Sequence, residues 1–499
     1  MRKFLLVAVV ACLATPASAQ SLNIALDGDI DSLDPTIART YVSRIVFAGL
    51  CDKLFDIDEK LAVVPQLALS YRYETSTSLI LHLRPDVTFQ DGTPMDAAAV
   101  AASLARHLSL PGSTRRAEIS ALAASEVIDP LTVKLTLKAP SAPFISQLTD
   151  RAGMIVSPKA AEALGANFGL APVCAGPFKL TERVAQDRIV LDRFAGYWNA
   201  SAIHFQRVVY RPIANNAVRF TNLQAGSIDL VAGLAASDVA AAQADKHLSV
   251  LLYDGLGYGA ITFNVANGPA ANTPFGQNAL VRKAFERAID RETLIGVVFN
   301  GLYSPTAQGM TPQNPLYNEN LKPLPRDVAA ARALLAQAHV ALPVPLTLTM
   351  VNSPEQLQVG EVLQAMANEA GFDVKVQASE FGAALDAETR GAFQATAIGW
   401  SGRVDPDGNL YNGLHSSGPL NASHYSNKNV DAWLDEARIA TNPADRKTLY
   451  AKITSQVAED MPGMYLYTTK NIMAMNAKLT GFHTIPDGLV RLQGMQGSK

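Results

Sequence analysis

Residues 78–100 read SLILHLRPDVTFQDGTPMDAAAV, a stretch that predicts a strand, a tight turn and the start of a helix. The LILHL segment places apolar residues on both sides of a histidine, the alternation typical of a strand. Residues 90–94, QDGTP, combine residue types that favour turns. Asp96 then stands where a helix N-cap is expected, before an alanine-rich segment of high helix propensity. The apolar stripe of this helix consists of Val100, Leu104 and Leu108.

Beyond residue 270 the patterns of helices and strands alternate along the chain. Residues 281–289 and 327–338 carry apolar side chains at helical spacing, and Gly371 is placed as a helix stop. The predicted strands are LTLTM at 346–350, FDVKV at 372–376 and AFQATAIGW at 392–400. This alternation indicates α/β layering.

Two further strand-like segments bracket the α/β region: LGYGAITFN at 256–264 and MYLYTTKNIM at 464–473. We found no repeat or low-complexity linker that separates independent modules. The two segments therefore predict paired crossover strands that act as a hinge. We interpret the glycines of GLGYG, at 255–259, as a source of backbone freedom in this hinge, since their spacing does not match a dinucleotide-binding motif.

The N-terminus has the pattern of an export signal. Arg2 and Lys3 precede an apolar run at residues 4–13 and then TPASAQ, so cleavage is expected just before Gln20. The run is too short for a membrane span, which needs about 20 residues. The alternative, lipid attachment at Cys12, is less consistent with the short apolar run.

The composition, 48% hydrophobic and 17% charged, is that of a globular protein of about three domains' worth of core. Removal of the signal leaves 40 basic and 45 acidic side chains and a net charge of −5, which argues against a nucleic-acid partner. Two cysteines remain, Cys51 and Cys174. We expect two buried thiols; one disulfide is the alternative, because sequence separation does not give the distance between them.

The order of the sequence blocks resembles that of the solute-binding proteins of dipeptide, oligopeptide and nickel importers. The match covers nearly the whole mature chain, beginning with DSLDPTIA at 31–38 and the block at 78–100. The later blocks are SPKAAEALG at 157–165, CAGPFKL at 174–180, DRFAGYWNA at 192–200, RPIANNAVRFTNLQAGSIDLV at 211–231, ALVRKAFERAIDRETLI at 279–295, GWSGRVDPDGNLY at 399–411 and PADRKTLYAKITSQVAEDMPGMYLY at 443–467. Each block is weak evidence alone, but their shared order is specific.

The resemblance implies an α/β, two-lobed periplasmic-binding-protein type II fold (cluster C) with an extra N-terminal subdomain and a two-strand hinge. The expected divisions are a signal peptide at 1–19, lobe I at 20–264 with a subdomain at 45–172, completion of lobe I by 469–499, and lobe II at 265–468. Such a protein closes over a peptide or peptide-like solute, works as a periplasmic monomer and docks on an ABC permease with its ATPase subunits.

In many peptide-binding relatives a carboxylate shortly after the tryptophan that corresponds to Trp400 pairs with the α-ammonium group of the peptide. Here Arg403 stands at or next to that position, and the loop is one residue shorter. A guanidinium repels an ammonium group and binds a carboxylate or phosphate, so we expect an anionic, opine-like or sugar-like ligand. The alternative is that Arg403 pairs with Asp405 or Asp407 and only orders its loop, which leaves Asp405 for the ammonium. We interpret residues 405–408, DPDG, as an ordinary turn.

The remaining candidate ligand contacts follow from the position of the cleft beyond the strand that ends at Trp400. We expect aromatic side chains to form walls of the cleft and one amide side chain to hydrogen-bond the ligand. We also expect the backbone of a turn of small residues to approach the ligand closely. The candidates are Trp400, Tyr411, Tyr41, Asn412, Thr40, Arg39, Cys174, Ala175 and Gly176.

Other classes of function have less support in the sequence. The usual hydrolase, nucleotide-binding and zinc-protease motifs are missing, so we predict no enzyme, no cofactor and no resident metal. His415 and His424 flank the cleft loop and would be the residues to touch a metal complex, although ordinary structural histidines are the simpler interpretation. A receptor that passes its ligand to a sensor remains an alternative to an importer.

Overall fold

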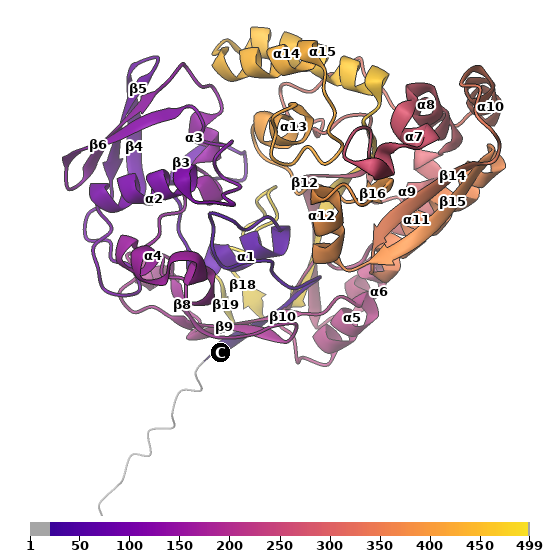
Figure 1. Ribbon diagram of the computed structural model, residues 1–499. Helices are drawn as coiled ribbons and strands as arrows, with labels where there is room; N and C mark the ends of the chain where they lie inside the picture. The colour runs from indigo at the N-terminus through magenta and orange to yellow at the C-terminus, as the bar shows by residue number, and fades with distance from the viewer. Residues whose placement is uncertain (1–19, 498–499) are drawn as a thin grey trace, which may run out of the picture.

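The computed structural model describes residues 20–497. The predicted signal peptide and the alternative lipid site at Cys12 lie outside these residues. Figure 1 shows the N-terminal half of the chain on one side, in indigo to magenta, and the α/β region on the other, in red to orange. The two long strands β12 (Leu248–Phe263) and β17 (Gly463–Asn476) join them. No helix of the described residues is both long and apolar enough to span a membrane.

A mixed sheet of eleven strands runs through both halves, in the order β15-β14-β16-β12-β17-β11-β1-β10-β9-β8, with β13 beside β17. β12 and β17 pair antiparallel from Leu248 opposite Asn476 to Thr262 opposite Gly463, with irregular register between Asp254 and Tyr258. The predicted pairing of the two crossover strands is therefore confirmed. β12 begins eight residues earlier than predicted, at Leu248, and hinge motion about these strands stays a prediction.

Lobe I contains one end of this sheet and a separate subdomain. The main-sheet strands are β1 (Ser21–Leu26), β8 (Phe178–Val184), β9 (Arg188–Arg193), β10 (Arg207–Pro212) and β11 (Leu230–Ala232). The subdomain has a four-stranded antiparallel sheet in the order β4 (Ala68–Thr75), β5 (Ser78–Leu83), β7 (Thr132–Leu137) and β6 (Leu122–Asp129). Short pairs are formed by β2 (Phe55–Ile57) with β3 (Val63–Pro65) and by β18 (Leu479–Thr480) with β19 (Gln496–Gly497). The helices are α1 (Tyr41–Leu50), α2 (Ala97–Ser109), α3 (Phe144–Gln147), α4 (Pro158–Leu164), α5 (Asn216–Gln224) and α6 (Val239–Ala244).

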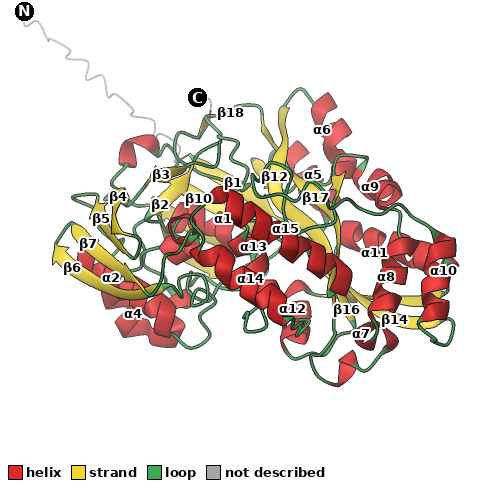
Figure 2. Ribbon diagram, turned by 90° about the horizontal axis from the view of Figure 1, so that it is seen from above, coloured by secondary structure: helices red, strands yellow, loops and turns green. Residues whose placement is uncertain are grey.

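Lobe II contains the parallel strands β14 (Val344–Val351), β15 (Phe372–Ser379) and β16 (Ala395–Ala397), and the short β13 (Ser304–Pro305). Its first helices are α7 (Pro274–Gln277), α8 (Ala279–Ala288), α9 (Arg291–Phe299), α10 (Val328–Gln337), α11 (Pro354–Glu369) and α12 (Phe381–Thr389). Three helices follow: α13 (Asp407–Leu414), α14 (Lys428–Ile439) and α15 (Pro443–Asp460). α14 and α15 pack against one another, and Figure 2 shows them lying side by side.

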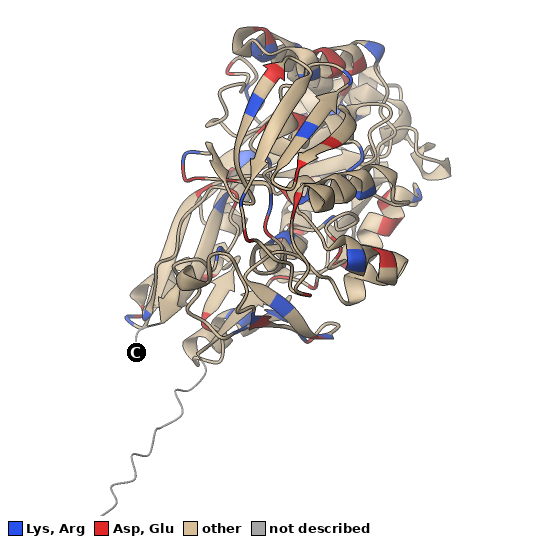
Figure 3. Cartoon of the chain, turned by 90° about the vertical axis from the view of Figure 1, so that its left-hand side faces the viewer, with Lys and Arg blue, Asp and Glu red and all other residues tan. Residues whose placement is uncertain are grey.

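The apolar core consists of four clusters of buried side chains. One fills the main sheet of lobe I and one the subdomain, where Val100, Leu104 and the buried face of β5 meet. The third covers the α/β sheet, and the fourth lies under α13, α14 and α15. α5 and α6 contribute to the third cluster, although they precede residue 264. The predicted domain boundaries therefore stay predictions. Acidic and basic residues are mixed along the elements seen in Figure 3.

Most elements predicted from sequence patterns are present. Asp96 caps α2 by accepting a hydrogen bond from the N–H of Ala99, and Gly371 follows α11 with φ +107°. One prediction needs correction, since the strand expected over 392–400 is limited to Ala395–Ala397. The turn expected at 405–408 is present, because the N–H of Gly408 donates to the carbonyl of Asp405 at 3.1 Å, and it leads directly into α13. Pro406 is compatible with a helix start, because its missing N–H has no intrahelical partner there.

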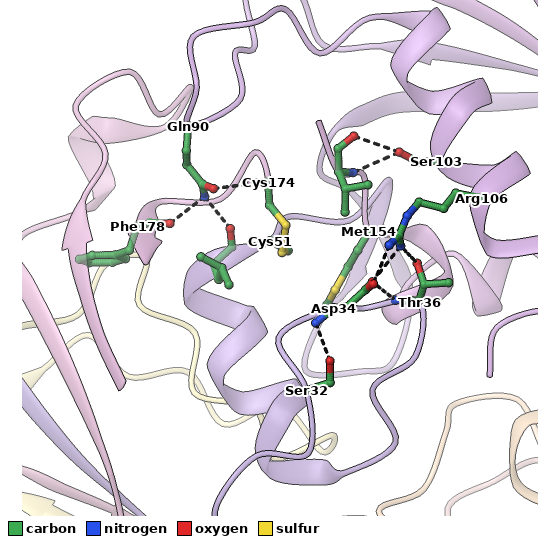
Figure 4. The surroundings of a disulfide bond; sticks show 12 residues. Ser32, Asp34, Thr36, Cys51, Gln90, Ser103, Arg106, Met154, Cys174 and Phe178 are labelled. Atoms are coloured by element: carbon green, nitrogen blue, oxygen red, sulfur yellow. Dashed lines mark hydrogen bonds and ion pairs between the residues drawn. A yellow bond between two sulfur atoms is a disulfide. The ribbon is translucent and has the colours of Figure 1, made fainter. Parts of the chain in front are cut away.

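Cys51 and Cys174 form a disulfide, with Cα atoms 4.9 Å apart. The expectation of two free thiols was therefore wrong. Figure 4 shows Gln90 beside this bond. Its side-chain Nε2 donates to the carbonyls of Leu50 and Phe178, each at 2.7 Å, and its Oε1 accepts from the N–H of Cys174 at 2.6 Å. The QDGTP turn thus holds together the two backbone segments that carry the cysteines.

Candidate functional site

Two adjoining cavities lie between the lobes. Cavity 1 has a volume of about 450 Å³ and cavity 2 of about 400 Å³. Both are lined by Thr40, Tyr41, Tyr258, Phe381, Ile398, Gly399, Trp400 and Ser401. These residues come from the start of α1, the hinge strand β12, the start of α12 and the segment after β16. The candidate site is therefore built from both lobes and from the hinge.

The loop at 31–40 positions the lobe I side of the site. Asp31 accepts hydrogen bonds from the N–H of Arg39 at 2.6 Å and from the hydroxyls of Thr40 and Ser43, each at 2.7 Å. Asp34 binds Arg106 of α2 with both carboxylate oxygens, at 2.9 and 2.6 Å. The DSLDPTIA block consequently fixes the start of α1, where Thr40 is the N-cap, against the subdomain.

Trp400 lies where the sequence predicts it, just beyond the carboxyl end of β16. Its backbone pairs with Tyr258 of β12, and its indole N–H donates to Oδ1 of Asn409 at 3.1 Å. These contacts hold the ring as a wall common to both cavities. An aromatic ring with a fixed position can pack against a solute without further loss of side-chain entropy.

Arg403 lines neither cavity 1 nor cavity 2. Its Nε lies 2.7 Å from Oδ2 of Asp150 in the subdomain, and its guanidinium lies 4.8 Å from the centre of the Trp400 ring. Burial and the neighbouring Arg44 lower the pKa of Arg403 to about 10, so it stays charged at neutral pH. The sequence suggested that Arg403 binds either an anionic ligand or a carboxylate of its own loop. Neither interpretation identifies Asp150 as its partner, because Asp150 belongs to the other lobe.

The two carboxylates that follow Arg403 are bound to other arginines. Asp405 forms a two-point ion pair with Arg446 of α15, at 2.8 and 2.9 Å. Asp407 forms one with Arg438 of α14, at 2.6 and 3.0 Å, and accepts a hydrogen bond from Gln147 at 2.8 Å. Asp405 therefore anchors the start of α13, and its carboxylate is already paired.

Tyr411 and Asn412 are neighbours on α13 but point to different surroundings. The Tyr411 ring stacks on His415 with a centroid distance of 4.6 Å, its hydroxyl donates to Asp435 at 3.0 Å, and it lines neither cavity. Asn412 lines cavity 1 and is 5% exposed. Its Oδ1 has no hydrogen-bond partner among residues 20–497. The structure thus places Asn412, and not Tyr411, at the candidate site.

On the lobe I side, Tyr41 and Thr40 both line the two cavities. The Tyr41 hydroxyl donates to the carbonyl of Gly488 at 2.7 Å, so its ring and not its hydroxyl is available to a solute. Cys174, Ala175 and Gly176 are not in the lining of either cavity. All three are buried behind α1, where a Cβ on Gly176 would lie 2.4 Å from the carbonyl of Leu50.

Several charged residues of the cavities were not predicted from sequence. Cavity 1 is lined by Arg115 and Arg151 as well as Arg39, and by Glu118 and Glu388. Arg115 and Glu118 form an ion pair. Burial raises the pKa of Glu388 to about 7, although Arg39 opposes the shift. The segments RRAEIS at 115–120 and DRAG at 150–153 carry no recognisable motif, so only the fold brings Arg115, Glu118 and Arg151 together.

Cavity 2 has the opposite charge balance. Asp27 and Glu355 line it, and neither has an ion-pair partner within 4 Å among the described residues. Burial raises the pKa of Glu355 to about 7 and also raises the pKa of Asp27. Arg219 lies nearby, but its guanidinium donates to the carbonyls of Ile213, Ala214 and Gly233.

The two histidines near the cleft are separate. His424 lines cavity 1, whereas His415 lies against Tyr411 and 3.5 Å from Asp435. Within residues 20–497 no group of three or more His, Cys, Asp or Glu side chains is arranged to hold a metal ion.

Comparison with known proteins defines the class. Residues 62–421 match the model of the bacterial extracellular solute-binding proteins, family 5. The glutathione-binding protein GsiB of Escherichia coli strain K12 is 30% identical over 485 residues, which cover 94% of this chain and 93% of that protein. The chain therefore belongs to family 5 of the bacterial extracellular solute-binding proteins.

Solved structures support the same fold. The ABC transporter-associated periplasmic binding protein DppA from Helicobacter pylori, in complex with the peptide STSA, has a TM-score of 0.87 and 24% identity over 96% of this chain and 98% of its own. The binding protein AgaA from A.tumefacien R10, in complex with agropinic acid, has the same TM-score and identity, over 96% and 99%. The predicted periplasmic-binding-protein fold is confirmed.

Proposed function

We propose that this protein is the periplasmic substrate-binding component of an ABC importer, which captures a peptide or peptide-like small solute between its lobes and delivers it to the permease. The observation that carries the proposal is the pair of adjoining cavities, walled by Tyr41 and Trp400 from opposite lobes. Cavities of this size, partly apolar and with a few converging polar groups, suit small solutes.

The charge distribution agrees with a peptide-like solute. Cavity 1 contains three guanidiniums, and cavity 2 contains the unpaired carboxylates of Asp27 and Glu355. A zwitterionic molecule that spans both cavities can place its carboxylate beside the guanidiniums and its ammonium group beside Asp27 and Glu355. The ammonium charge lowers the raised pKa of these two carboxyls and so favours their ionised form. The relative named for glutathione binding makes glutathione, a small acidic peptide, the first compound to test.

The protein acts as a monomer without catalysis, a cofactor or a nucleic-acid partner, and releases its solute unchanged. The alternatives are an anionic opine-like or sugar-like solute, a metal complex, or delivery to a sensor. The solved AgaA complex with agropinic acid supports inclusion of opines among the compounds tested.

A thermal-shift screen of the chain from Gln20 onward tests this proposal. The compounds are glutathione, dipeptides, tripeptides, agropinic acid, sugar phosphates and nickel–histidine. A solute that binds only the folded state raises the melting temperature, and at 100 times its Kd it stabilises by about 2.7 kcal/mol. We expect a shift with glutathione or short peptides, and chromatography should recover the compound intact. Shifts with sugar phosphates or nickel–histidine alone, or hydrolysis of the peptide, would overturn the proposal.

A further inference from the structure

The charges in cavity 1 do not cancel. Arg39, Arg115 and Arg151 line it, together with Glu118 and Glu388. Arg115 and Glu118 neutralise each other as an ion pair. Glu388 has no ion-pair partner within 4 Å among the described residues, and burial raises its pKa to about 7, so it is only partly ionised near neutral pH. Arg39 and Arg151 are then the two guanidiniums of cavity 1 without a close ion pair, although burial and the neighbouring Arg115 lower the pKa of Arg151.

Arg151 is the buried member of this pair, with 1% of its surface exposed. Its Nη1 donates to the carbonyl of Ala38 at 2.8 Å, but its Nε has no hydrogen-bond partner among residues 20–497. The nearest carboxylate, Asp150, lies 3.9 Å from this Nε. Asp150 is shared with Arg44 at 3.1 Å and Arg403 at 2.7 Å, so one carboxylate serves three guanidiniums. A buried cation with so little compensation favours an anion beside it.

Arg39 supplies the second guanidinium. Its backbone N–H is fixed by Asp31, at 2.6 Å, but its side chain forms no ion pair or hydrogen bond with the described part of the chain. A guanidinium presents a planar set of donors that matches the two oxygens of a carboxylate. Arg39 therefore lines the cavity as an available donor.

Asn412 adds a neutral polar group from lobe II. It lines the same cavity and is 5% exposed, and its Oδ1 lacks a hydrogen-bond partner in the described residues. A buried amide oxygen without a donor costs free energy, on the order of 1–3 kcal/mol. A solute N–H that donates to this Oδ1 in cavity 1 removes the cost.

We propose that cavity 1 is a carboxylate subsite, in which Arg39 and Arg151 of lobe I hold an acidic end of the solute, while Oδ1 of Asn412 of lobe II accepts a hydrogen bond from an N–H of the same solute. This inference rests on the proposed function and adds to it the substrate class, solutes with a free carboxylate. The subsite is separate from Arg403, whose guanidinium is bound to Asp150. Because the guanidiniums come from lobe I and the amide oxygen from lobe II, a solute that contacts both also helps to hold the lobes together.

Isothermal titration calorimetry with matched acids and blocked acids tests the subsite. The probes are glutathione with glutathione diethyl ester, and Ala-Ala-Ala with its C-terminal amide. The proteins are the wild type, Arg39→Gln and the control Arg390→Gln, which removes an exposed arginine next to α12 that does not line cavity 1. We expect the wild type to bind an acid at least about tenfold more tightly than its blocked form, a difference of about 1.4 kcal/mol.

Arg39→Gln should lower the affinity for the acid by about tenfold and leave the blocked form almost unchanged, whereas Arg390→Gln should alter neither. Equal binding of acid and blocked form, or equal losses for both in Arg39→Gln, would overturn the carboxylate subsite and leave the proposed function intact. If no probe of either kind binds the wild type, the proposed peptide-like solute class fails together with the subsite.

Discussion

Cys51 and Cys174 show how a single pair of residues ties the subdomain to lobe I. Cys51 is the C-cap of α1, and Cys174 lies 123 positions later, beyond the end of the subdomain. The bond therefore encloses the whole subdomain sheet in one covalent loop. The sequence did not reveal it, because two cysteines at this separation give no information on the distance between their Cα atoms.

The double variant Cys51→Ser, Cys174→Ser should lower the free energy of unfolding by about 2–5 kcal/mol, since the unfolded chain gains conformational freedom when a long loop is opened. Neither cysteine lines a cavity, so glutathione affinity at a temperature where the variant is folded should be unchanged. Urea denaturation followed by circular dichroism measures the first effect. The wild type treated with a reductant is the matched control, and equal midpoints for all three samples would contradict the prediction.

Among the side chains of the site, residue type was easier to predict than partner. Arg403 was the guanidinium expected to meet an anionic ligand, whereas the proposed carboxylate subsite uses Arg39 and Arg151, which line cavity 1. Arg403 is bound by a carboxylate from the other lobe. A sequence shows that a guanidinium is present, but the fold decides which carboxylate reaches it.

At the level of elements, the hinge strand β12 has its glycines for a different reason than the sequence suggested. Gly257 and Gly259 do not have positive φ angles. A Cβ on Gly257 would lie 2.8 Å from the carbonyl oxygen of Trp400, and one on Gly259 would lie 2.4 Å from the ring of Tyr467. These glycines allow close approach of the segment after β16 and of β17, so space and not backbone freedom explains them.

Gly259→Ala should therefore destabilise the protein by about 1–3 kcal/mol, because the added methyl group must displace a buried ring. Gly296→Ala is the matched control. Gly296 lies within α9, has no atom within 4 Å of an added Cβ and should be neutral or slightly stabilised by the better helix propensity of alanine. Thermal unfolding of the two variants makes the comparison. Equal melting temperatures would show that Tyr467 moves aside at no cost.

The elements with regular hydrophobic periodicity were predictable from sequence. α2, α8, α10, β5, β14 and β15 lie within a few residues of their predicted ranges. The helix α13 was not, because proline and glycine at 405–408 indicate only the turn that leads into it, while the helix is stabilised by distant partners. Arg438 and Arg446 bind Asp407 and Asp405 at its start, and neither ion pair is visible in the local pattern. The location of the candidate site beside Trp400 could be predicted from the sequence, but the arrangement of its charged side chains could not.

On the scale of the whole molecule, the lobes are in direct contact away from the cavities. Arg403 binds Asp150, Gln147 binds Asp407 at 2.8 Å, and the N–H of Ala142 donates to the carbonyl of Arg438 at 2.8 Å. These contacts lie on the subdomain side of the cleft and need no solute. They stabilise the arrangement in which the lobes are closed. A solute therefore has to supply less of the free energy of closure.

Arg403→Ala should consequently weaken binding of every solute by a similar factor, on the order of tenfold, because it removes an ion pair between the lobes and shifts the population toward open molecules. This uniform loss differs from the selective loss expected for Arg39→Gln. Small-angle X-ray scattering of the solute-free variant should give a larger radius of gyration than the wild type, and a saturating solute should restore the wild-type value. A loss confined to acidic solutes would instead place Arg403 in contact with the ligand.

The pH dependence of closure follows from Asp150. Burial raises the pKa of its carboxyl, but the guanidiniums of Arg44 and Arg403 outweigh this and hold the pKa well below its usual value of 3.8. A depressed carboxylate pKa gives stability that is present above the unfolded pKa and is lost only as the pH falls below it. The contribution of the Asp150 ion pair to closure should therefore stay constant from pH 8 to pH 5. The difference in radius of gyration between the wild type and Asp150→Asn should be constant over this range and shrink only in more acidic solution. The Asp150→Asn variant, which cannot form the ion pair, should have the larger radius from pH 8 to pH 5, and a difference that already shrinks near pH 6 would contradict the low pKa of Asp150.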